Sequence, residues 1–306
     1  MNTVKFSVFA DLHYCPDVFY SKAEEKLTAI QQRALENKVD FIIHAGDFCH
    51  GPAPHMAMVN RYLDFEIPSY SCLGNHDSDQ TSLAETLAAY RMPNDYYYFD
   101  CKGFRMVVMN LNYFIKDGEY LRFDRANYRD YGARGVMPPH ELEWLGETLE
   151  SSPYPCILIS HQSIERGPDG AKNAAEIRAV IDEANRKSPR KVMLVINGHY
   201  HKDFIRLLNN VVYLDLNSTA YDWLDKEHHL YPKELEEQYC LIQNTICVNE
   251  PIHAVVTLTD EGEVKIEGME GSYLNGVTKE MTDEPDFDPS GRPYRPRVSS
   301  AHIKLL

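Results

Sequence analysis

The sequence predicts an α/β protein with mixed β-sheets, and two features of its pattern support this fold class. Short apolar runs alternate with longer stretches of helical periodicity, as in chains built from βαβ units with largely parallel strands. Two pairs of apolar runs are separated only by a short polar turn, Lys102-Gly103 in one pair and Asn209-Asn210 in the other. Such turns are typical of antiparallel hairpins. We therefore expect sheets that are parallel in the middle and antiparallel at the edges.

The individual elements follow from the same pattern. Strands are predicted at apolar runs of strand length, which are 4–10, 39–45, 68–73, 96–101, 104–111, 155–160, 191–197, 204–208, 211–216, 252–259 and 263–269. Helices are predicted where apolar residues recur with helical spacing, at 21–36, 54–65, 81–90, 139–150 and 171–186. The pair Pro138-Pro139 indicates a helix start, because proline fits the first turn of a helix.

Three segments fall outside this alternation. Segment 112–137 is rich in Tyr, Arg and Gly with little periodicity, which predicts a long loop, and segment 221–250 is charged and partly helical. The last part, 276–306, is rich in proline and is predicted to form an extended C-terminal arm. A chain of 306 residues allows two domains or one large domain with a tail. We expect one domain, 1–275, with the first two segments as insertions.

The composition is globular with a strong acidic excess. The chain has 31 Lys+Arg against 46 Asp+Glu, a net charge of −15, and 43% hydrophobic residues. This excess argues against duplex DNA or an anionic membrane as a partner, since both need a basic patch, but not against small phosphorylated ligands. The seven cysteines form no C-x-x-C pair, and we identify no signal peptide and no apolar run near the ~20 residues of a membrane helix. We expect a soluble, cytoplasmic protein with free thiols.

Metal-binding residue types follow the buried strands. Strand 4–10 is followed by Asp11 and His13, and the next strands by Asp47, by Asn75-His76-Asp77, by His161, and by His199 and His201. The carboxyl ends of parallel strands form one edge of a sheet, where ligands bind. A single histidine after a strand is usually an ordinary loop residue, and Gly-Asn-His-Asp alone could be a turn. The occurrence of all these residues together, each after a strand, predicts a metal site.

This order of motifs, D-x-H, GD, GNHD, a single His and G-H-x-H, resembles that of the calcineurin-like metallophosphoesterases. The resemblance covers roughly residues 4–217 and implies a four-layer α/β/β/α sandwich with a two-metal centre. The implied ligands of one metal are Asp11, His13, Asp47 and His201. Those of the other are Asp47, Asn75, His161 and His199, with Asp47 bridging. The resemblance makes His76 the catalytic histidine and Asp77 the carboxylate that orients it.

This donor set suits two divalent ions such as Mn²⁺, Fe²⁺, Zn²⁺ or Co²⁺, because it mixes carboxylate and amide oxygens with imidazole nitrogens. A hydroxide between two such ions would attack phosphorus, and His76 would stabilise the transition state or protonate the leaving oxygen. The string GDFCHG differs from the GDxVDRG of protein Ser/Thr phosphatases, and His50 stands where purple acid phosphatases have a tyrosine ligand. The resemblance is greatest to bacterial phosphodiesterase-type members.

Several further residues have more than one interpretation. His50 could be an extra ligand or could support a ligand, but a loop histidine facing solvent or substrate is favoured. The histidines His140, His228 and His229 are expected at the surface. Arg129, Arg134 and Arg166 could bind a phosphate, although arginines exposed to solvent are the commoner case. Tyr221 could stack on a base or lie in the core.

The sequence thus predicts a dinuclear metal-dependent phosphoesterase that hydrolyses a small phosphodiester or nucleotide-like substrate through a metal-bridging hydroxide. A phosphomonoesterase is the main alternative, because the same residues serve either reaction. A DNA exonuclease would need a basic channel, and a non-catalytic binding scaffold would be expected to lack metal ligands. We expect no nucleic acid polymer and no membrane as a partner, and a homo-oligomer could form through the C-terminal arm.

Overall fold

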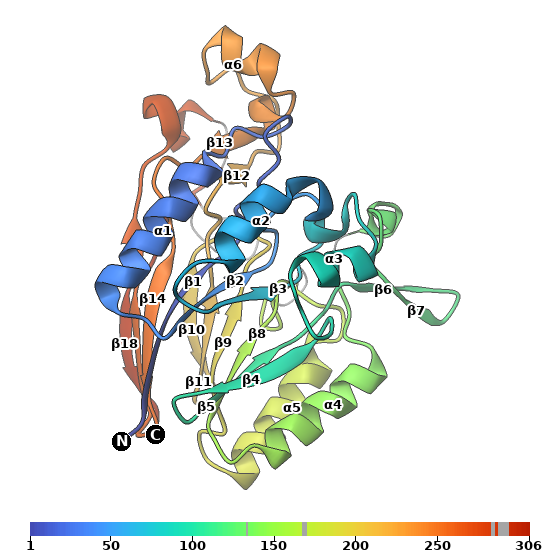
Figure 1. The fold of residues 1–306 in the computed structure, drawn as a ribbon, viewed down its shortest axis with the longest axis vertical. Coiled ribbons are helices and arrows are strands. Elements are labelled where there is room, and N and C mark those ends of the chain that lie inside the picture. Colours follow the sequence, from blue (N-terminus) through green and yellow to red (C-terminus); the bar gives the residue numbers. More distant parts are fainter. Residues whose placement is uncertain (133, 167–169, 283–284, 287–293) are drawn as a thin grey trace.

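The computed structural model describes residues 1–132, 134–166, 170–282, 285–286 and 294–306, and its centre is a pair of six-stranded mixed sheets. Helices α1 (Ala23–Asn37), α2 (Met56–Leu63) and α3 (Leu83–Ala89) accompany the first sheet, and α4 (Pro139–Ser151) and α5 (Ala174–Lys187) pack on the second (Figure 1). Helix α4 begins at Pro139, as the sequence predicts. The four-layer α/β/β/α architecture is confirmed.

The first sheet has the strand order β18-β15-β14-β1-β2-β3. Strands β1 (Thr3–Phe9), β2 (Phe41–Ala45) and β3 (Ser69–Cys72) are parallel, whereas β14 (Ala254–Thr259), β15 (Glu263–Glu267) and β18 (Ala301–Lys304) run antiparallel to their neighbours. The parallel strands therefore lie at one side of this sheet. The expectation that both edges are antiparallel is wrong here, because β3 is itself an edge strand.

The second sheet has the order β10-β11-β9-β8-β5-β4. Its inner strands β5 (Phe104–Val108), β8 (Cys156–Ile159), β9 (Val192–Asn197) and β11 (Val211–Asp215) are parallel. The edge strands β4 (Tyr97–Cys101) and β10 (Phe204–Leu208) close the two predicted hairpins. Both turn residues of each hairpin have positive φ, 52° and 82° at Lys102-Gly103 and 49° and 61° at Asn209-Asn210, the backbone of a tight hairpin turn.

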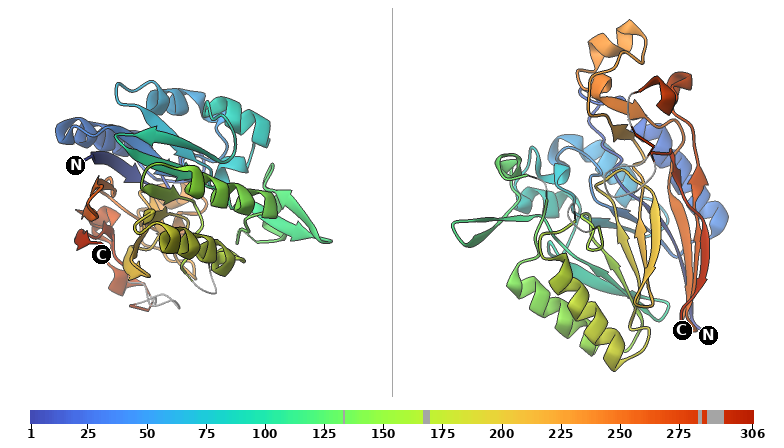
Figure 2. Two further views of the ribbon diagram at one scale, coloured as in Figure 1. Left: turned by 90° about the horizontal axis from the view of Figure 1, so that it is seen from below. Right: turned by 180° about the vertical axis from the view of Figure 1, so that it is seen from behind.

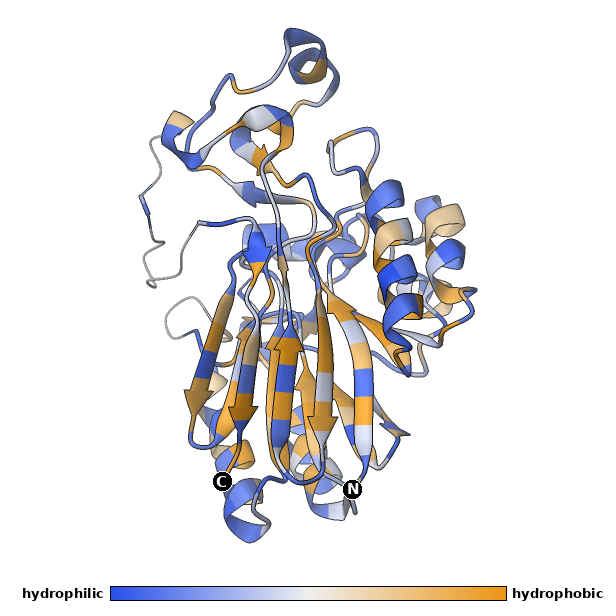
Figure 3. Cartoon of the chain, turned by 90° about the vertical axis from the view of Figure 1, so that its left-hand side faces the viewer, coloured by the Kyte–Doolittle hydropathy of each residue, from blue (hydrophilic) through white to orange (hydrophobic). Residues whose placement is uncertain are grey.

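The core consists of three layers of apolar side chains, because successive residues of a strand point to opposite faces. Val4, Phe6 and Val8 of β1 meet residues such as Ile157 and Ile159 of β8 between the two sheets. The alternate residues of the strands pack under the helices, α1 and α2 on the first sheet and α4 and α5 on the second. Figure 3 shows the resulting bands of hydrophobic and hydrophilic residues along the strands of the first sheet.

The segments outside the predicted alternation contain more structure than expected. Within 112–137, β6 (Tyr113–Lys116) and β7 (Glu119–Arg122) form a hairpin that projects from the molecule (Figure 2). Every side chain of β7 is exposed, which explains why no apolar alternation marks this strand in the sequence. Segment 221–250 contains β12 (Tyr221–Trp223), α6 (Lys233–Gln238) and β13 (Thr245–Cys247), with β12 and β13 paired.

The segment predicted as a C-terminal arm, 276–306, ends as part of the first sheet, because β18 pairs with β15. Its residues Arg297–Val298 form β17, which pairs with β16 (Met269–Glu270). Residues 283–284 and 287–293 of this segment lie outside the described residues. The two chain ends lie side by side (Figures 1 and 2). Within the described part of the chain, no helix combines the length and the apolar character needed to cross a membrane.

Candidate metal centre

The loops at the carboxyl ends of parallel strands from both sheets meet at one place. The loop after β1 is hydrogen-bonded to the loop after β2, with the Asp11 amide donating to the Gly46 carbonyl (3.1 Å) and the His13 amide to the Asp47 carbonyl (3.0 Å). The second sheet is joined to them by the His199 amide, which donates to Oδ2 of Asp11 (3.0 Å). These bonds join the loops after three strands, β1, β2 and β9, at one edge of the two sheets.

Much of the backbone in these loops adopts the left-handed conformation. Asp11, His13, Asp47, His199 and His201 have φ angles of 54°, 48°, 52°, 73° and 52°. Residues other than glycine rarely adopt this region, and each such residue costs about 1–3 kcal/mol. Strain of this kind clusters at functional sites. Here all five residues with this backbone belong to the groups of side chains that converge at the centre.

One group of buried side chains consists of Asp11, His13 and His201, whose donor atoms all lie within 4.8 Å of one another. Nε2 of His201 lies 3.3 Å from Oδ1 of Asp11, and Nε2 of His13 lies 3.1 Å from Nε2 of His201. Such converging imidazole and carboxylate donors could hold one metal ion. The resemblance assigns the same three residues to one metal.

A second group consists of Asp47, His161 and His199, again with donor atoms within 4.8 Å. Oδ2 of Asp47 lies 3.0 Å from Nε2 of His161 and 4.0 Å from Nε2 of His13, so this carboxylate lies between the two groups. Nδ1 of His199 lies 3.3 Å from Nε2 of His161. Asp47 is thus located where a carboxylate could bridge two ions.

Asn75 follows β3 and is buried, and the amide of the next residue, His76, donates to Oδ1 of Asp47 (2.8 Å). Its amide Nδ2 donates to the Tyr128 hydroxyl (3.2 Å). Its carbonyl Oδ1 is buried and has no hydrogen-bond partner among the described residues. An unpaired buried carbonyl is costly in a folded protein. This oxygen fits the role of a metal ligand.

The charge balance of the centre also fits bound cations. Among the residues that the structure describes, the ion-pair contacts of Asp11 and Asp47 are all with histidines. Burial would raise the pKa of Asp47, but His161 and His76 outweigh it and hold the pKa well below the usual value. Buried carboxylates are normally paired with cations or coordinate metals. The donor set therefore fits divalent ions.

His76 lies at the edge of the centre, and its orienting carboxylate is Asp79. Nδ1 of His76 lies 2.7 Å from Oδ2 of Asp79. Donor atoms of His76, His13 and Asp47 lie within 4.8 Å of one another. Burial lowers the pKa of His76, but Asp47 and Asp79 outweigh it and raise the pKa above the usual value.

The prediction that Asp77 orients His76 is therefore corrected. Oδ2 of Asp77 accepts the amides of Asp47 (3.0 Å) and Gly74 (2.8 Å), and its Oδ1 accepts the Tyr90 hydroxyl (2.5 Å). Burial and the nearby Asp47 raise the pKa of Asp77 to about 7. Residues 76–78 form a 3₁₀ turn, in which side chains three residues apart align. For this reason Asp79, and not Asp77, lies against His76.

Other functional side chains were missed or assigned differently. His50 is 6% exposed and lies against His13 and Asp79, so the favoured interpretation of a loop histidine facing solvent or substrate is wrong. Tyr128 contacts Asn75 and Asp79 and carries no signal in the sequence, because no pattern there places segment 112–137 beside His76. Tyr221 is buried and stacks on His13, with ring centroids 4.9 Å apart.

The three arginines contact other groups of the protein. Arg129 pairs with Asp79 (3.0 Å), Arg134 donates to the Gly170 carbonyl (2.6 Å), and the guanidinium of Arg166 lies 4.1 Å from the centre of the Tyr200 ring. Of the histidines expected at the surface, His140 and His229 are exposed, whereas His228 is half-buried, so the expectation is wrong for His228. His229 pairs with Glu236.

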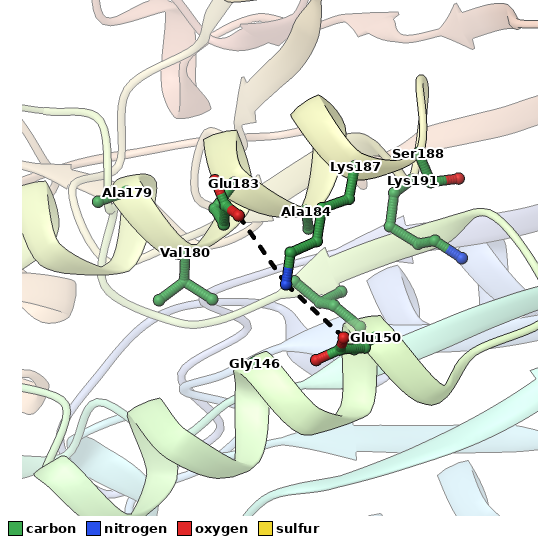
Figure 4. Close-up of a pocket in the computed structure, with 10 residues that line it drawn as sticks. Gly146, Glu150, Ala179, Val180, Glu183, Ala184, Lys187, Ser188 and Lys191 are labelled. Atoms are coloured by element: carbon green, nitrogen blue, oxygen red, sulfur yellow. Dashed lines mark ion pairs between the residues drawn. The ribbon is translucent and has the colours of Figure 1, made fainter.

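A separate cavity of about 660 Å³ lies between α4 and α5. Figure 4 shows Lys187 of α5 between Glu150 of α4, at 3.6 Å, and Glu183 of its own helix, at 3.8 Å. None of the residues that line it belongs to the metal centre. Its ion pairs and small apolar side chains offer no group suited to phosphoryl chemistry, so the centre described above remains the candidate site.

The fold and the grouped donors define a class of protein, the metal-dependent hydrolases of phosphoric esters. The model of the calcineurin-like phosphoesterases matches residues 4–203. The chain belongs to this family.

Individual relatives are distant. A 3',5'-cyclic-nucleotide phosphodiesterase of Nostoc sp. PCC 7120 is 24% identical over 212 residues, which cover 65% of this chain and 70% of the relative. A dimetal phosphatase from Danio rerio has a TM-score of 0.61 at 14% identity, covering 90% of this chain and 100% of that one. GAP50, an anchor in the inner membrane complex of Plasmodium, has a TM-score of 0.54 at 13% identity, covering 100% and 89%. Likeness at this identity concerns the fold, which hosts several functions.

Proposed function

We propose that the protein hydrolyses a small phosphodiester or nucleotide-like substrate at a dinuclear metal centre. The observation that carries this proposal is the convergence of Asp11, Asp47 and the surrounding histidines in a buried centre. Among the described residues, its carboxylates form ion pairs only with histidines. Two divalent ions held there would polarise the phosphoryl group and lower the pKa of a bound water. The distant similarity to a cyclic-nucleotide phosphodiesterase supports the substrate class.

In this proposal the residues of the chain have two roles, metal binding and action on the substrate. Asp11, His13 and His201 would hold one ion, Asn75, His161 and His199 the other, and Asp47 would bridge them. With Nδ1 of His76 against Asp79, the Nε2 atom of His76 is the one left to act on substrate. From the edge of the centre it would donate a hydrogen bond to the phosphoryl group or a proton to the leaving oxygen.

The charges beside the centre favour a diester over a monoester. A phosphodiester carries one negative charge near neutral pH, whereas a monoester approaches two. Arg129 and Lys202 are cations near His76 and His201, and each is paired with a carboxylate, Asp79 and Asp222 respectively, at 3.0 Å. Their charge is already balanced within the protein. The net charge of −15 further favours small anions over polymeric nucleic acid.

A substrate comparison tests this proposal. The purified protein is analysed for bound metals, stripped with a chelator, reloaded with Mn²⁺, and assayed with bis-p-nitrophenyl phosphate, p-nitrophenyl phosphate, 3',5'-cyclic AMP and a dinucleotide. We expect a higher kcat/KM for diesters than for the monoester, and no turnover in the stripped protein. A preference for the monoester would replace the proposal with a phosphomonoesterase. Absence of both metal and hydrolysis would favour a non-catalytic scaffold.

A further inference from the structure

We propose that Asp79 and His50 form a two-residue relay that orients His76 and also sets the tautomer of His13, so that Nε2 of His13 is free to bind metal. The relay deepens the proposed function, because it links the histidine that would act on substrate with a histidine that would hold an ion. It rests on the contacts of a small buried cluster at the ends of β1, β2 and β3.

Asp79 is the anchor of this cluster. Its side chain is only 3% exposed. Oδ2 faces Nδ1 of His76 (2.7 Å), Nδ1 of His50 (3.2 Å) and a guanidinium nitrogen of Arg129 (3.0 Å), while Oδ1 accepts the Tyr128 hydroxyl (2.7 Å). The carboxylate is thus surrounded by four donor groups, three at Oδ2 and one at Oδ1. Burial raises the pKa of Asp79, but His50 and His76 outweigh it and keep the carboxyl ionised.

His50 lies between Asp79 and His13. Its Nδ1 points to Oδ2 of Asp79, and its Nε2 lies 3.0 Å from Nδ1 of His13. Its ring lies beside that of His76, with centroids 4.4 Å apart and an angle of 30° between the planes. Both ring nitrogens of His50 therefore have a partner, and these partners determine which nitrogen carries the hydrogen atom.

Which ring nitrogens carry a hydrogen atom follows from whether each partner can donate a hydrogen bond or only accept one. An ionised carboxylate only accepts, so Nδ1 of the neutral His50 must carry its proton and Nε2 must hold the lone pair. That lone pair needs a donor, which Nδ1 of His13 supplies. His13 is then protonated at Nδ1, and its Nε2, which lies 3.7 Å from Oδ1 of Asp11 and 3.1 Å from Nε2 of His201, has a free lone pair. Metal-bound histidines are commonly fixed by a hydrogen bond at the other ring nitrogen.

Histidine NMR tests the relay independently of turnover. The full chain is labelled with ¹⁵N-histidine and measured free of metal and loaded with Zn²⁺, and signals are assigned with single-histidine variants. We expect His13 and His50 to be protonated at Nδ1 in both forms, and we expect Asp79→Ala to remove this preference. Protonation of His13 at Nε2 in the unaltered, metal-free protein would overturn the proposal.

A matched pair of variants at His50 keeps the test decisive if Asp79→Ala folds poorly. The amide of His50→Gln can accept from His13 and donate to Asp79, whereas His50→Met has a similar size without either group. Zn²⁺ affinity, measured by chelator competition, should fall about 10–100-fold in His50→Met and stay near the unaltered value in His50→Gln. Equal affinities in the two variants would contradict the relay.

Asp95→Ala is the control for loss of a buried carboxylate. Asp95 is 1% exposed and accepts hydrogen bonds from Asn110 and Tyr113, away from the metal centre. This variant should lose stability but keep the His13 tautomer and the Zn²⁺ affinity. If the unaltered protein has the expected tautomers but hydrolyses no phosphate ester, the proposed function fails and the relay stands. If esters are hydrolysed but Asp79→Ala leaves tautomers and affinity unchanged, the relay fails alone.

Discussion

The two halves of the metal centre hold their histidines in different ways. On the side of the first sheet, His13 and His76 are joined by side chains, through His50 and Asp79. On the side of the second sheet, Nδ1 of His161 lies 2.8 Å from the Ala45 carbonyl, and Nδ1 of His201 is buried without a partner among the described residues. One half therefore depends on a side-chain network, and the other depends mainly on the backbone.

This difference predicts different sensitivities. A side-chain network fails when one member is replaced, because each hydrogen bond orients the next group. Histidines held by backbone conformation, such as His199 and His201 with φ of 73° and 52°, depend instead on the loop that carries them. Variants on each side can measure how far the two halves act separately.

Replacement of Asp47 should have the largest effect, because this carboxylate lies between the halves. We expect Asp47→Asn to abolish both metal retention and turnover, since the amide carries no negative charge to balance two cations. Metal content by elemental analysis and turnover with Mn²⁺ measure the two losses. Asp95→Asn is the matched control and should keep both. Full activity of metal-free Asp47→Asn protein would contradict the proposed dinuclear centre.

Variants of His76 and His161 should distinguish a loss of catalysis from a loss of metal binding. We expect His76→Ala to keep its metal and lose about 10²–10⁴-fold in kcat, the usual contribution of a general acid or base. His161→Ala, on the second side, should lose metal from the pair and turnover with it. Metal content and kcat are measured on the same preparations. Loss of metal from His76→Ala would mean that this residue is a ligand.

Two glycines test the backbone on each side. A Cβ at Gly74 would lie 2.2 Å from Oδ1 and 2.3 Å from the backbone nitrogen of Asp47, whereas one at Gly198 would lie 2.7 Å from Oδ2 of Asp11 and from Cβ of Ala10. We expect each change to alanine to cost about 1–3 kcal/mol of unfolding free energy, with Gly74→Ala at the upper end because a backbone atom must move. Urea denaturation measures the free energy of unfolding of both variants. A larger loss of stability in Gly198→Ala than in Gly74→Ala would contradict this prediction.

Lys26 connects the two sides and should give a smaller, pH-dependent effect. It lies on α1 with its Nζ donating to the carbonyls of Thr219 and Val248, both at 2.7 Å. Burial lowers the pKa of Lys26 to about 7. The ionisable groups that act on it are Lys22, Glu25, Cys247 and Glu250.

The sign of the effect follows from proton uptake. The unfolded chain binds the Lys26 proton below its ordinary pKa near 10.5, and the folded chain binds it only below about 7. Between these values the unfolded state binds more protons, so stability rises with pH. We expect this group to add about 1 kcal/mol between pH 7 and pH 8. Urea denaturation at both pH values measures the free energy of unfolding. Its rise between pH 7 and pH 8 should be smaller in Lys26→Met and unchanged in the control Lys265→Met, which replaces an exposed lysine. The same rise in both variants would contradict the assignment.

Most residues of the candidate site can be named from the sequence because they follow buried strands. Asp11, Asp47, His161 and His199 each come directly after an apolar run or one residue later, and the shared edge of parallel strands then brings them together. The carboxylate that faces His76 cannot be predicted in this way. The 3₁₀ turn at 76–78 decides that Asp79 and not Asp77 faces the ring. His50 was misjudged for a related reason, since nothing local shows that the loops after β1 and β3 enclose it.

The sequence alone therefore determined the fold class, the residue types of the candidate site and the strand ends that carry them, because these depend on periodicity and on residue type. Only the tertiary structure decided which side chains meet across the loops. It placed Asp47 between two histidine groups and His50 between Asp79 and His13. It also joined the last residues, 301–304, to the first sheet. Contacts between segments far apart in the chain depend on packing and backbone conformation, which no local pattern encodes.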